Sequence, residues 1–320
     1  MRAIRVTKLG DPEVLKLEQV PTPEPASDQI KVKIEAIGVN PVDTYIRSGY
    51  QGYDPVVPYT PGYDAAGVVD AVGKDVKGFS PGARVYLSGS VSGTYAEYAI
   101  CNPEQLHPLP THVSFAQGAS LYVAYVTAYR GLVQRAESCP GETVLIHGTS
   151  GAVGIAAIQF AQNLGMRIIA TASSEEGQQL AAGQGADLVL DHSDPTHFNM
   201  IMDYTESSGV NVILEMMANI NLDNDLRILA QKGRVIVVGN RDTITINPRD
   251  TMACDGAILG MSLMNICAQD EKEIHSAIVA GLNNKTLRPV IRCELPLKEA
   301  PMAHDMVMES GSCGKIILIP

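Results

Sequence analysis

Aromatic residues and long apolar runs are both scarce in this chain of 320 residues. It has no tryptophan and only four phenylalanines, and aromatic side chains make up 5% of it. No apolar run approaches the roughly 20 residues that a membrane-spanning helix needs. The first six residues, Met1 to Val6, follow the pattern of a strand and not that of a signal peptide. We therefore expect a soluble, cytoplasmic protein.

Basic residues and closely spaced cysteines are also lacking. The chain has 24 Lys and Arg against 35 Asp and Glu, a formal net charge of −11. Dedicated nucleic-acid and anionic-membrane binders need a dense basic face, so the composition disfavours both classes. None of the six cysteines lies within three residues of another, which excludes a C-x-x-C metal site. We expect the thiols to be buried or idle.

The strongest motif is a glycine-rich turn between an apolar run and a helix-like segment. Gly148, Gly151 and Gly154 follow the apolar residues 144–146, with a Gly-x-x-Gly-x-x-Gly spacing in place of the usual Gly-x-Gly-x-x-Gly. Such glycines let backbone amides approach a pyrophosphate, and the helix N-terminus adds partial positive charge. The motif predicts dinucleotide binding, with a plain strand–helix turn as the alternative.

The chain has two parts that differ in their residue patterns. The first hundred residues alternate short apolar runs with Pro and Gly, and the alternation over Ile30–Ile37 predicts a half-exposed strand. Residues 1–115 are therefore expected to form a small, mainly antiparallel β domain.

From residue 116 onward, strand patterns alternate with helix patterns, which indicates an α/β fold with a doubly wound parallel sheet. We assign residues 116–262 to this cofactor-binding domain of Rossmann type. The expected strands are 144–147, 167–171, 187–190, 211–215, 234–238 and 256–262. Gly165 and Gly183 stand where helices should stop. The segment 263–320 ends in the apolar strand Lys315–Ile319, which we expect to return to the first domain.

The end of the second strand bears on the choice of cofactor. NAD-binding folds usually carry an acid there for the ribose 2′-OH, but this strand ends in Ala172, Ser173 and Ser174. Without the acid a 2′-phosphate meets no repulsion, which favours NADPH. No basic residue follows closely, and Glu175 and Glu176 are expected to point away from the site, so NAD stays open.

Several stretches resemble the zeta-crystallin family, the zinc-free NADPH:quinone oxidoreductase branch of the medium-chain dehydrogenase/reductase superfamily. The stretches that carry the resemblance are Gly38–Gly49, Pro58–Gly62, Ser92–Tyr98, His147–Gly154, Gly233–Gly239 and Ile246–Ala253. The resemblance runs over nearly the whole chain. It implies a GroES-like β domain joined to a Rossmann domain, with the active cleft between them.

The resemblance also implies positions for the cofactor. The expected pyrophosphate residues are Ser150, Gly151, Ala152 and Val153, with Ser173 and His192 near the adenosine end. The expected groove residues are Asn221, Val238, Gly239, Asn240 and Arg241, with Met261, Ser262 and Leu263 near the nicotinamide. A surface turn is the alternative for residues 239–241.

Substrate-facing groups are expected on the segment 40–47. By the resemblance Tyr45 flanks the cofactor, and Asn40 and Tyr45 face the quinone. Asn40 could instead cap a turn before Pro41, and Tyr45 could be a core aromatic. Asp43 and Arg47 have the i,i+4 spacing of a helical ion pair.

Zinc enzymes of the superfamily carry an early Cys and a Gly-His-Glu after the Pro-Gly turn. This chain has Asn40 in the first place and Gly62-Tyr63-Asp64 in the second. We therefore expect no metal site and no Lewis-acid mechanism.

The activity implied by the resemblance is NADPH-dependent reduction of quinones, by one electron and with ortho-quinones favoured. One alternative is reduction of activated alkenes such as enals, for which Tyr45 is the only plausible proton donor. Another is a non-enzymatic role, in binding AU-rich RNA or as a structural crystallin. The apolar segment Gly256–Ser262 would form the edge of the sheet, which predicts pairing with a second copy in a homodimer or homotetramer.

Overall fold

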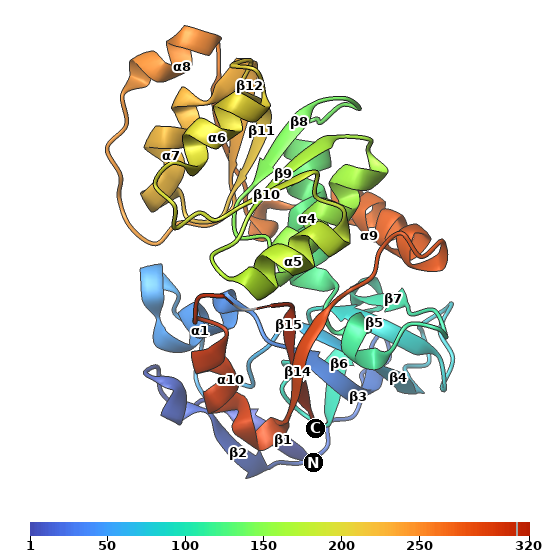
Figure 1. Ribbon diagram of the computed structural model, residues 1–320. Coiled ribbons are helices and arrows are strands. Elements are labelled where there is room, and N and C mark those ends of the chain that lie inside the picture. The colour runs from blue at the N-terminus through green and yellow to red at the C-terminus, as the bar shows by residue number, and fades with distance from the viewer. Residues whose placement is uncertain (312) are drawn as a thin grey trace. The chain divides into compact units, whose positions relative to one another are not determined.

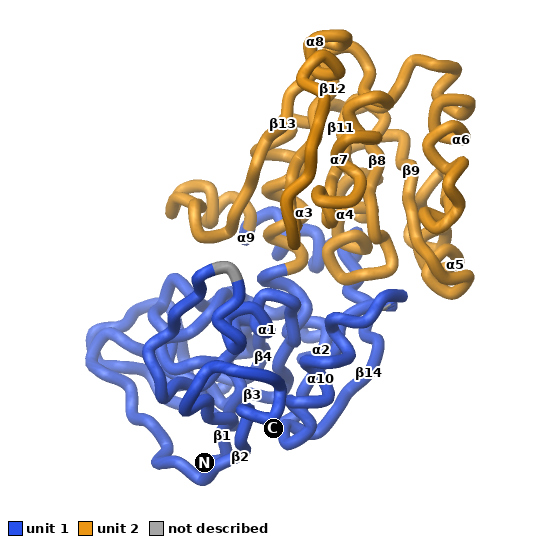
Figure 2. The backbone as a smooth tube through the Cα atoms, turned by 90° about the vertical axis from the view of Figure 1, so that its left-hand side faces the viewer, with its two compact units in different colours: residues 1–123, 275–320 blue, residues 124–274 orange. Residues whose placement is uncertain are grey.

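The computed structural model describes residues 1–311 and 313–320, and the chain divides into two compact units (Figure 2). Unit 1 comprises residues 1–123 and 275–320, and unit 2 comprises residues 124–274. The residue patterns predicted domain boundaries at 115/116 and 262/263. The second boundary between the units falls inside helix α9 (Ala268–Asn283), where no change of texture marks it.

Unit 1 is built on a mainly antiparallel sheet with the strand order β14-β15-β3-β4-β5-β7, in which β6 also pairs with β3. A separate hairpin-like pair joins β1 to β2. The strands are β1 (Arg2–Arg5), β2 (Lys16–Gln19), β3 (Ile30–Gly38), β4 (Asp64–Val72), β5 (Arg84–Ser88), β6 (Tyr98–Cys101), β7 (Leu106–Pro108), β14 (Ile291–Pro296) and β15 (Lys315–Ile319). As predicted, the last strand returns to this sheet, where it lies between β14 and β3. The helices of the unit are α1 (Pro41–Ser48), α2 (Phe115–Gly118) and α10 (Ala300–Met306).

The strand β3 is more buried than its alternating pattern predicted. It pairs with β4 along one edge, and with β6 and β15 along the other. The polar residues of the alternation differ in exposure: Lys31 is buried, with its ammonium 3.1 Å from a carboxylate oxygen of Asp70, whereas Lys33 is exposed and Glu35 is half-exposed. The expectation of a half-exposed strand holds at Lys33 and Glu35 but not at Lys31, whose ammonium is paired with Asp70 and Glu24.

Unit 2 is a six-stranded parallel sheet in the order β10-β9-β8-β11-β12-β13 (Figure 1). Its strands are β8 (Thr143–Ile146), β9 (Arg167–Thr171), β10 (Leu188–Leu190), β11 (Val210–Glu215), β12 (Leu229–Val237) and β13 (Ala257–Gly260). Its helices are α3 (Thr127–Tyr129), α4 (Ala152–Asn163), α5 (Glu175–Gln184), α6 (His197–Tyr204), α7 (Ala218–Arg227) and α8 (Pro248–Cys254). The predicted doubly wound sheet is confirmed. The strand order reverses at β8, which creates a topological switch point between β8 and β11.

Only one of the two predicted helix-stop glycines has that role. Helix α4 is followed by Gly165, whose φ of 71° is left-handed, as predicted. Helix α5 instead continues through Gly183 and ends at Gly185, whose φ is 108°. A Cβ at Gly185 would lie 2.5 Å from Nε2 of Gln162, whereas nothing lies within 4 Å of one at Gly183. The left-handed backbone conformation favours glycine at the later position, and a Cβ there would also displace the end of the Gln162 side chain.

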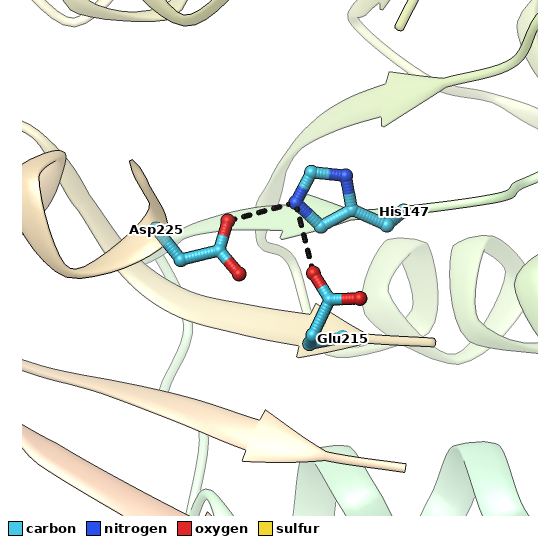
Figure 3. Close-up of side chains that lie close together, drawn as sticks. All are labelled: His147, Glu215 and Asp225. Atoms are coloured by element: carbon cyan, nitrogen blue, oxygen red, sulfur yellow. Dashed lines mark hydrogen bonds and ion pairs between the residues drawn. The ribbon is translucent and has the colours of Figure 1, made fainter. Parts of the chain in front are cut away.

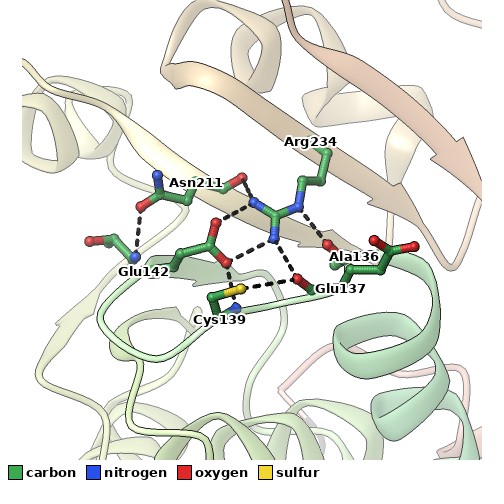
Figure 4. Close-up of polar contacts among 7 residues, drawn as sticks. Ala136, Glu137, Cys139, Glu142, Asn211 and Arg234 are labelled. Atoms are coloured by element: carbon green, nitrogen blue, oxygen red, sulfur yellow. Dashed lines mark hydrogen bonds and ion pairs between the residues drawn. The ribbon is translucent and has the colours of Figure 1, made fainter.

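One arginine joins β12 to the loop that precedes β8. The guanidinium of Arg234 bonds to both carboxylate oxygens of Glu142, at 2.6 and 2.8 Å, and to the carbonyl oxygen of Ala136 at 2.7 Å (Figure 4). It also bonds to the carbonyl oxygen of Asn211, whose side chain accepts from the amide of Thr143. This two-pronged contact fixes the amino ends of β8, β11 and β12.

None of the described helices is both long enough and apolar enough to cross a membrane.

Candidate functional site

The glycine turn leads from β8 directly into α4. Gly148 has a φ of 65°, which favours glycine, and Gly151 is the N-cap residue of α4. A Cβ on Gly154 would lie 2.5 Å from the Cα of Thr149, so only glycine lets the helix pack this closely on the turn. The amide and hydroxyl of Thr149 both donate to the carbonyl oxygen of Thr171, at 2.9 and 3.0 Å. The turn is thereby fixed to the end of β9.

The first turn of α4 offers backbone amides to an anion. Because the N-cap residue is Gly151, no side chain caps the amides that follow it. Ala152 and Val153 are half-buried and Ser150 is buried, so the amides lie at a partly desolvated helix N-terminus. The aligned peptide dipoles add partial positive charge there. A pyrophosphate fits this donor set.

The end of β9 carries no acid beside this turn. Ser173 is exposed, and Ser174 caps α5 by accepting from the amide of Gly177 at 3.1 Å. A Cβ on Gly177 would lie 2.9 Å from the Cβ of Ser150, so this glycine keeps α5 against the glycine turn. The carboxylate of Glu175 accepts from Nε2 of Gln179 at 3.2 Å and is thus directed along its own helix.

The turn after β12 is fixed by backbone contacts. The amides of Val238 and Gly239 both donate to the carbonyl oxygen of Glu215, at 2.8 and 3.2 Å. A Cβ on Gly239 would lie 2.2 Å from the carbonyl oxygen of Met216, so the turn touches the loop after β11 too closely for any larger residue. The amide of Arg241 donates to Oδ1 of Asn219 at 3.0 Å.

The residues predicted for the cofactor on unit 2 lie on one edge of its sheet. The strands are parallel, so the loops that follow them meet at the carboxyl edge, where ligands bind in such folds. The predicted cofactor residues of unit 2 all lie in loops or helix starts that follow a strand of this sheet, from β8 to β13. They are Ser150, Gly151, Ala152, Val153, Ser173, His192, Asn221, Val238, Gly239, Asn240, Arg241, Met261, Ser262 and Leu263. Asn40 and Tyr45 belong to unit 1.

Asn40 takes part in a buried polar cluster of unit 1. Its Nδ2 donates to Oδ2 of Asp64 at 3.1 Å, and its Oδ1 accepts from the ammonium of Lys315. The same ammonium lies 2.6 Å from Oδ2 of Asp64. A lysine cation is therefore bound between the side chains of Asn40 and Asp64.

The helix α1 presents Tyr45 and buries Asp43. The half-buried Tyr45 ring packs at 5.4 Å from the ring of Tyr50. Asp43 accepts from the amide of Asn40 at 2.9 Å and from the hydroxyl of Tyr95 at 3.3 Å.

The expected ion pair of Asp43 with Arg47 is not found among those of residues 1–311 and 313–320. The Asp43 carboxylate instead accepts from the amide of Asn40, the N-cap residue of α1. Burial raises the pKa of Asp43 to about 7, and the nearby charge of Asp64 adds to the effect.

His147, Glu215 and Asp225 form a buried cluster beside the glycine turn that the sequence motifs did not predict. Nε2 of His147 lies 2.9 Å from Oδ1 of Asp225 and 3.4 Å from Oε2 of Glu215 (Figure 3). Among the described residues, these three form the one group of His and acidic side chains whose ligating atoms, all within 4.8 Å, could share a metal ion. The spacings are those of hydrogen bonds, and we interpret the group as a hydrogen-bonded cluster. An acid that ends the apolar run Val212–Leu214 was its only sequence signal.

The chain resembles known dehydrogenases and reductases over its whole length. A family model described as zinc-binding dehydrogenase matches residues 152–280, and one described as alcohol dehydrogenase GroES-like domain matches residues 26–111. Over 321 residues the chain is 44% identical to the quinone oxidoreductase of Homo sapiens, covering 100% of this chain and 98% of that protein.

Solved structures agree with this assignment. The Escherichia coli quinone oxidoreductase complexed with NADPH matches with a TM-score of 0.91 at 28% identity, and an NAD-dependent alcohol dehydrogenase with 0.93 at 27%. Each match covers all of both chains. The protein is thus a member of the quinone oxidoreductase family of the medium-chain dehydrogenase/reductase superfamily, with a GroES-like and a Rossmann-type unit.

Proposed function

We propose that this chain reduces quinones with NADPH. The observation that carries the proposal is the uncapped glycine turn at the switch point of a parallel sheet, in a chain of this family. The amides after Gly151 would bind the pyrophosphate, and the turn after β12 would line the groove. When bound, NADPH supplies the reducing electrons. The protein's contribution is to hold the nicotinamide and an electron-poor ring in contact.

The preference for NADPH over NADH rests on the end of β9. Ser173 and Ser174 put hydroxyls where an acid would repel a 2′-phosphate, and the Glu175 carboxylate is bonded to its own helix. The amide-rich start of α5 lies beside the glycine turn through Gly177. We expect NADPH to bind at least about tenfold more tightly than NADH, a difference of about 1.4 kcal/mol.

The substrate side of the proposal concerns α1. Tyr45 is half-buried and has its ring against Tyr50, so it can flank a planar ligand. Asn40 has both ends of its amide bonded to Asp64 and Lys315, so its contribution would be to hold the start of α1 in place. We assign no residue as a general acid that would protonate the substrate. Transfer of single electrons to ortho-quinones does not need one, so the proposed reaction is consistent with this site.

The proposed reaction uses no metal. A zinc ion bound near Asn40 and Asp64 would face the ammonium of Lys315, which lies 2.6 Å from the Asp64 carboxylate. Like charges at such a separation repel strongly in a buried site. Purified protein should therefore contain no stoichiometric zinc, and chelators should leave its activity intact.

The proposed assembly is a homodimer or a dimer of dimers. Among the described strands, β13 stands at the edge of its sheet beside β12, and its residue Ile258 is 37% exposed. An apolar edge without Lys or Pro is an aggregation hazard unless it is covered. Pairing of β13 with the same strand of a second copy would satisfy its free backbone groups.

A substrate panel tests the proposed activity. NADPH oxidation is followed at 340 nm with an ortho-quinone, a para-quinone and an enal, in parallel with spin-resonance detection of semiquinone. We expect turnover with quinones, fastest with the ortho-quinone and accompanied by a semiquinone signal. Turnover of the enal alone would replace the proposal with alkene reduction. Tight RNA binding without any turnover would replace it with a binding role.

A further inference from the structure

His147, Glu215 and Asp225 form a fully enclosed cluster that the proposed reaction does not use. The three side chains come from the residue after β8, the last residue of β11 and the last turn of α7 (Figure 3). His147 is 3% exposed, and both acids are 0% exposed. Three buried titratable side chains are costly to a fold, and such groups cluster at functional sites, so this cluster calls for a role.

The cluster contacts the glycine turn through Thr171. The hydroxyl of Thr171 lies 3.3 Å from Nδ1 of His147, and it accepts from the amide of Gly148 at 3.4 Å. With Thr171 donating to Nδ1, the ring hydrogen of His147 is on Nε2, which faces Asp225 and Glu215. A chain of hydrogen bonds thus runs from the first glycine of the turn to the buried acids.

The cluster contacts the start of α7 through Glu215. Its carboxylate accepts from the amide of Met217, and Oε2 accepts from Nδ2 of Asn221 at 3.1 Å. Asn221 is one of the residues we propose for the cofactor groove. The same three side chains therefore hold two separate parts of the proposed dinucleotide site.

The cluster holds more negative charge than one imidazole can balance. Oδ2 of Asp225 is buried without a hydrogen-bond partner. Burial raises the pKa of Glu215 and of Asp225 to about 7 each, and it lowers the pKa of His147. Two carboxylates that face one ring in low dielectric cannot both ionise readily, so a proton shared by the group is lost near neutral pH.

The groups that face the cluster do not supply the missing positive charge. Thr171 faces it from β9 and Asn221 from α7, and both are uncharged. Phe198 of α6 lies 6.3 Å from the His147 ring, and His197 packs on Phe198. His192, in the loop before α6, has its pKa lowered by loss of solvent and by His147. The cluster therefore becomes more negative as its proton leaves, and none of these neighbours offsets the change.

We propose that His147, Glu215 and Asp225 are positioning residues that couple dinucleotide binding to the uptake of a proton. The inference rests on the proposed function, because the ligand is the dinucleotide of that site. A pyrophosphate at the glycine turn adds negative charge beside the cluster and favours the protonated cluster. Affinity for the dinucleotide falls as pH rises through neutrality, and the hydrogen bonds to Thr171 and Asn221 transmit the effect.

The test measures the dissociation constants of NADPH and NADH between pH 6 and 9, from the fluorescence of the bound nicotinamide. Both constants should rise by about five- to tenfold over this range, in keeping with typical coupling between sites. NADH lacks the 2′-phosphate, so a shared pH dependence excludes titration of that phosphate. Calorimetry of the wild-type protein in two buffers of different ionisation enthalpy should register proton uptake near pH 7.

Two variants of α7 separate the cluster from general charge effects. Asp225→Asn removes one titrating carboxylate but keeps an acceptor for His147, so it should flatten the pH dependence and keep the tight affinity of low pH. Asp223→Asn is the matched control, because Asp223 is on the same helix but is partly exposed and paired with Arg227. It should retain the wild-type pH dependence.

The outcomes separate this inference from the proposed function. Tight NADPH binding with a pH-independent constant and no proton uptake overturns the coupling and leaves the quinone reductase proposal standing. A pH dependence that survives in Asp225→Asn also overturns it. Absence of NADPH binding at every pH overturns the proposed function and the coupling together. Should Asp225→Asn fail to fold, the wild-type calorimetry decides by itself.

Discussion

Replacement of Lys315 by Met should destabilise unit 1 strongly. Lys315 and Asp64 are 3% and 0% exposed, and their charged atoms lie 2.6 Å apart. Without the ammonium, the hydrogen bonds that the described residues still give to the Asp64 carboxylate are those from Nδ2 of Asn40 at 3.1 Å and from the amide of Val123 at 2.9 Å. Removal of one partner of a buried pair leaves an uncompensated charge and typically costs about 3–5 kcal/mol. We expect Lys315→Met to lower the free energy of unfolding by this amount.

The assay is urea unfolding followed by circular dichroism at 222 nm and by tyrosine fluorescence, since the chain has no tryptophan. The double variant Asp64→Asn/Lys315→Met carries neither charge and should recover most of the loss. Lys33→Met is the control, because the Lys33 side chain is 54% exposed in its ion pair with Glu35 and should change stability by less than about 1 kcal/mol. A loss below about 1 kcal/mol for Lys315→Met, or no recovery in the double variant, would show that the buried pair does not stabilise unit 1 in this way.

Three further changes test other parts of the account. Asp43 has a folded pKa of about 7, above its ordinary 3.8, so its stabilising effect is full below about pH 4 and is lost as pH rises through 7. Relative to wild type, Asp43→Asn should therefore gain up to about 4 kcal/mol between pH 4 and pH 8 in urea unfolding. Gly239→Ala would place a Cβ 2.2 Å from the carbonyl oxygen of Met216, so the turn after β12 would have to move. NADPH binding should weaken by about tenfold or more in fluorescence titration, while α5 and β9 keep their structure. Ser173→Asp should reverse the cofactor preference, and an unchanged ratio of NADPH to NADH dissociation constants would place the 2′-phosphate elsewhere.

The sequence patterns predicted the sheet of unit 2 well because its signals are local. Each buried parallel strand is a short apolar run, and the glycine turn lies between a strand and a helix that are adjacent in sequence. The strand Lys315–Ile319 was predicted with its observed bounds because it is too apolar to remain exposed. The error at Gly183 arose because two glycines stand two residues apart and the spacing does not show which of them takes the left-handed conformation that ends α5.

The polar clusters could not be predicted because their members are far apart in the chain. His147 and Asp225 are separated by 78 residues, and Lys315 and Asn40 by 275. None of these residues lies in a pattern that marks its partner, and the packing of helices, strands and loops in the folded units brings the partners together. The helical spacing of Asp43 and Arg47 predicted a pair, but the N-terminus of α1 and Tyr95 hold the Asp43 carboxylate instead. Local spacing states which contacts are possible, and tertiary packing selects among them.

The most direct test of the account is oxidation of bound NADPH in a single turnover. Protein freed of metal by a chelator is mixed with less than one equivalent of NADPH, and then with an ortho-quinone in a stopped-flow instrument that records absorbance at 340 nm. We expect complete loss of the NADPH absorbance, at a rate that the chelator does not change. Bound NADPH that survives every quinone, or oxidation that returns only when zinc is added, would contradict it.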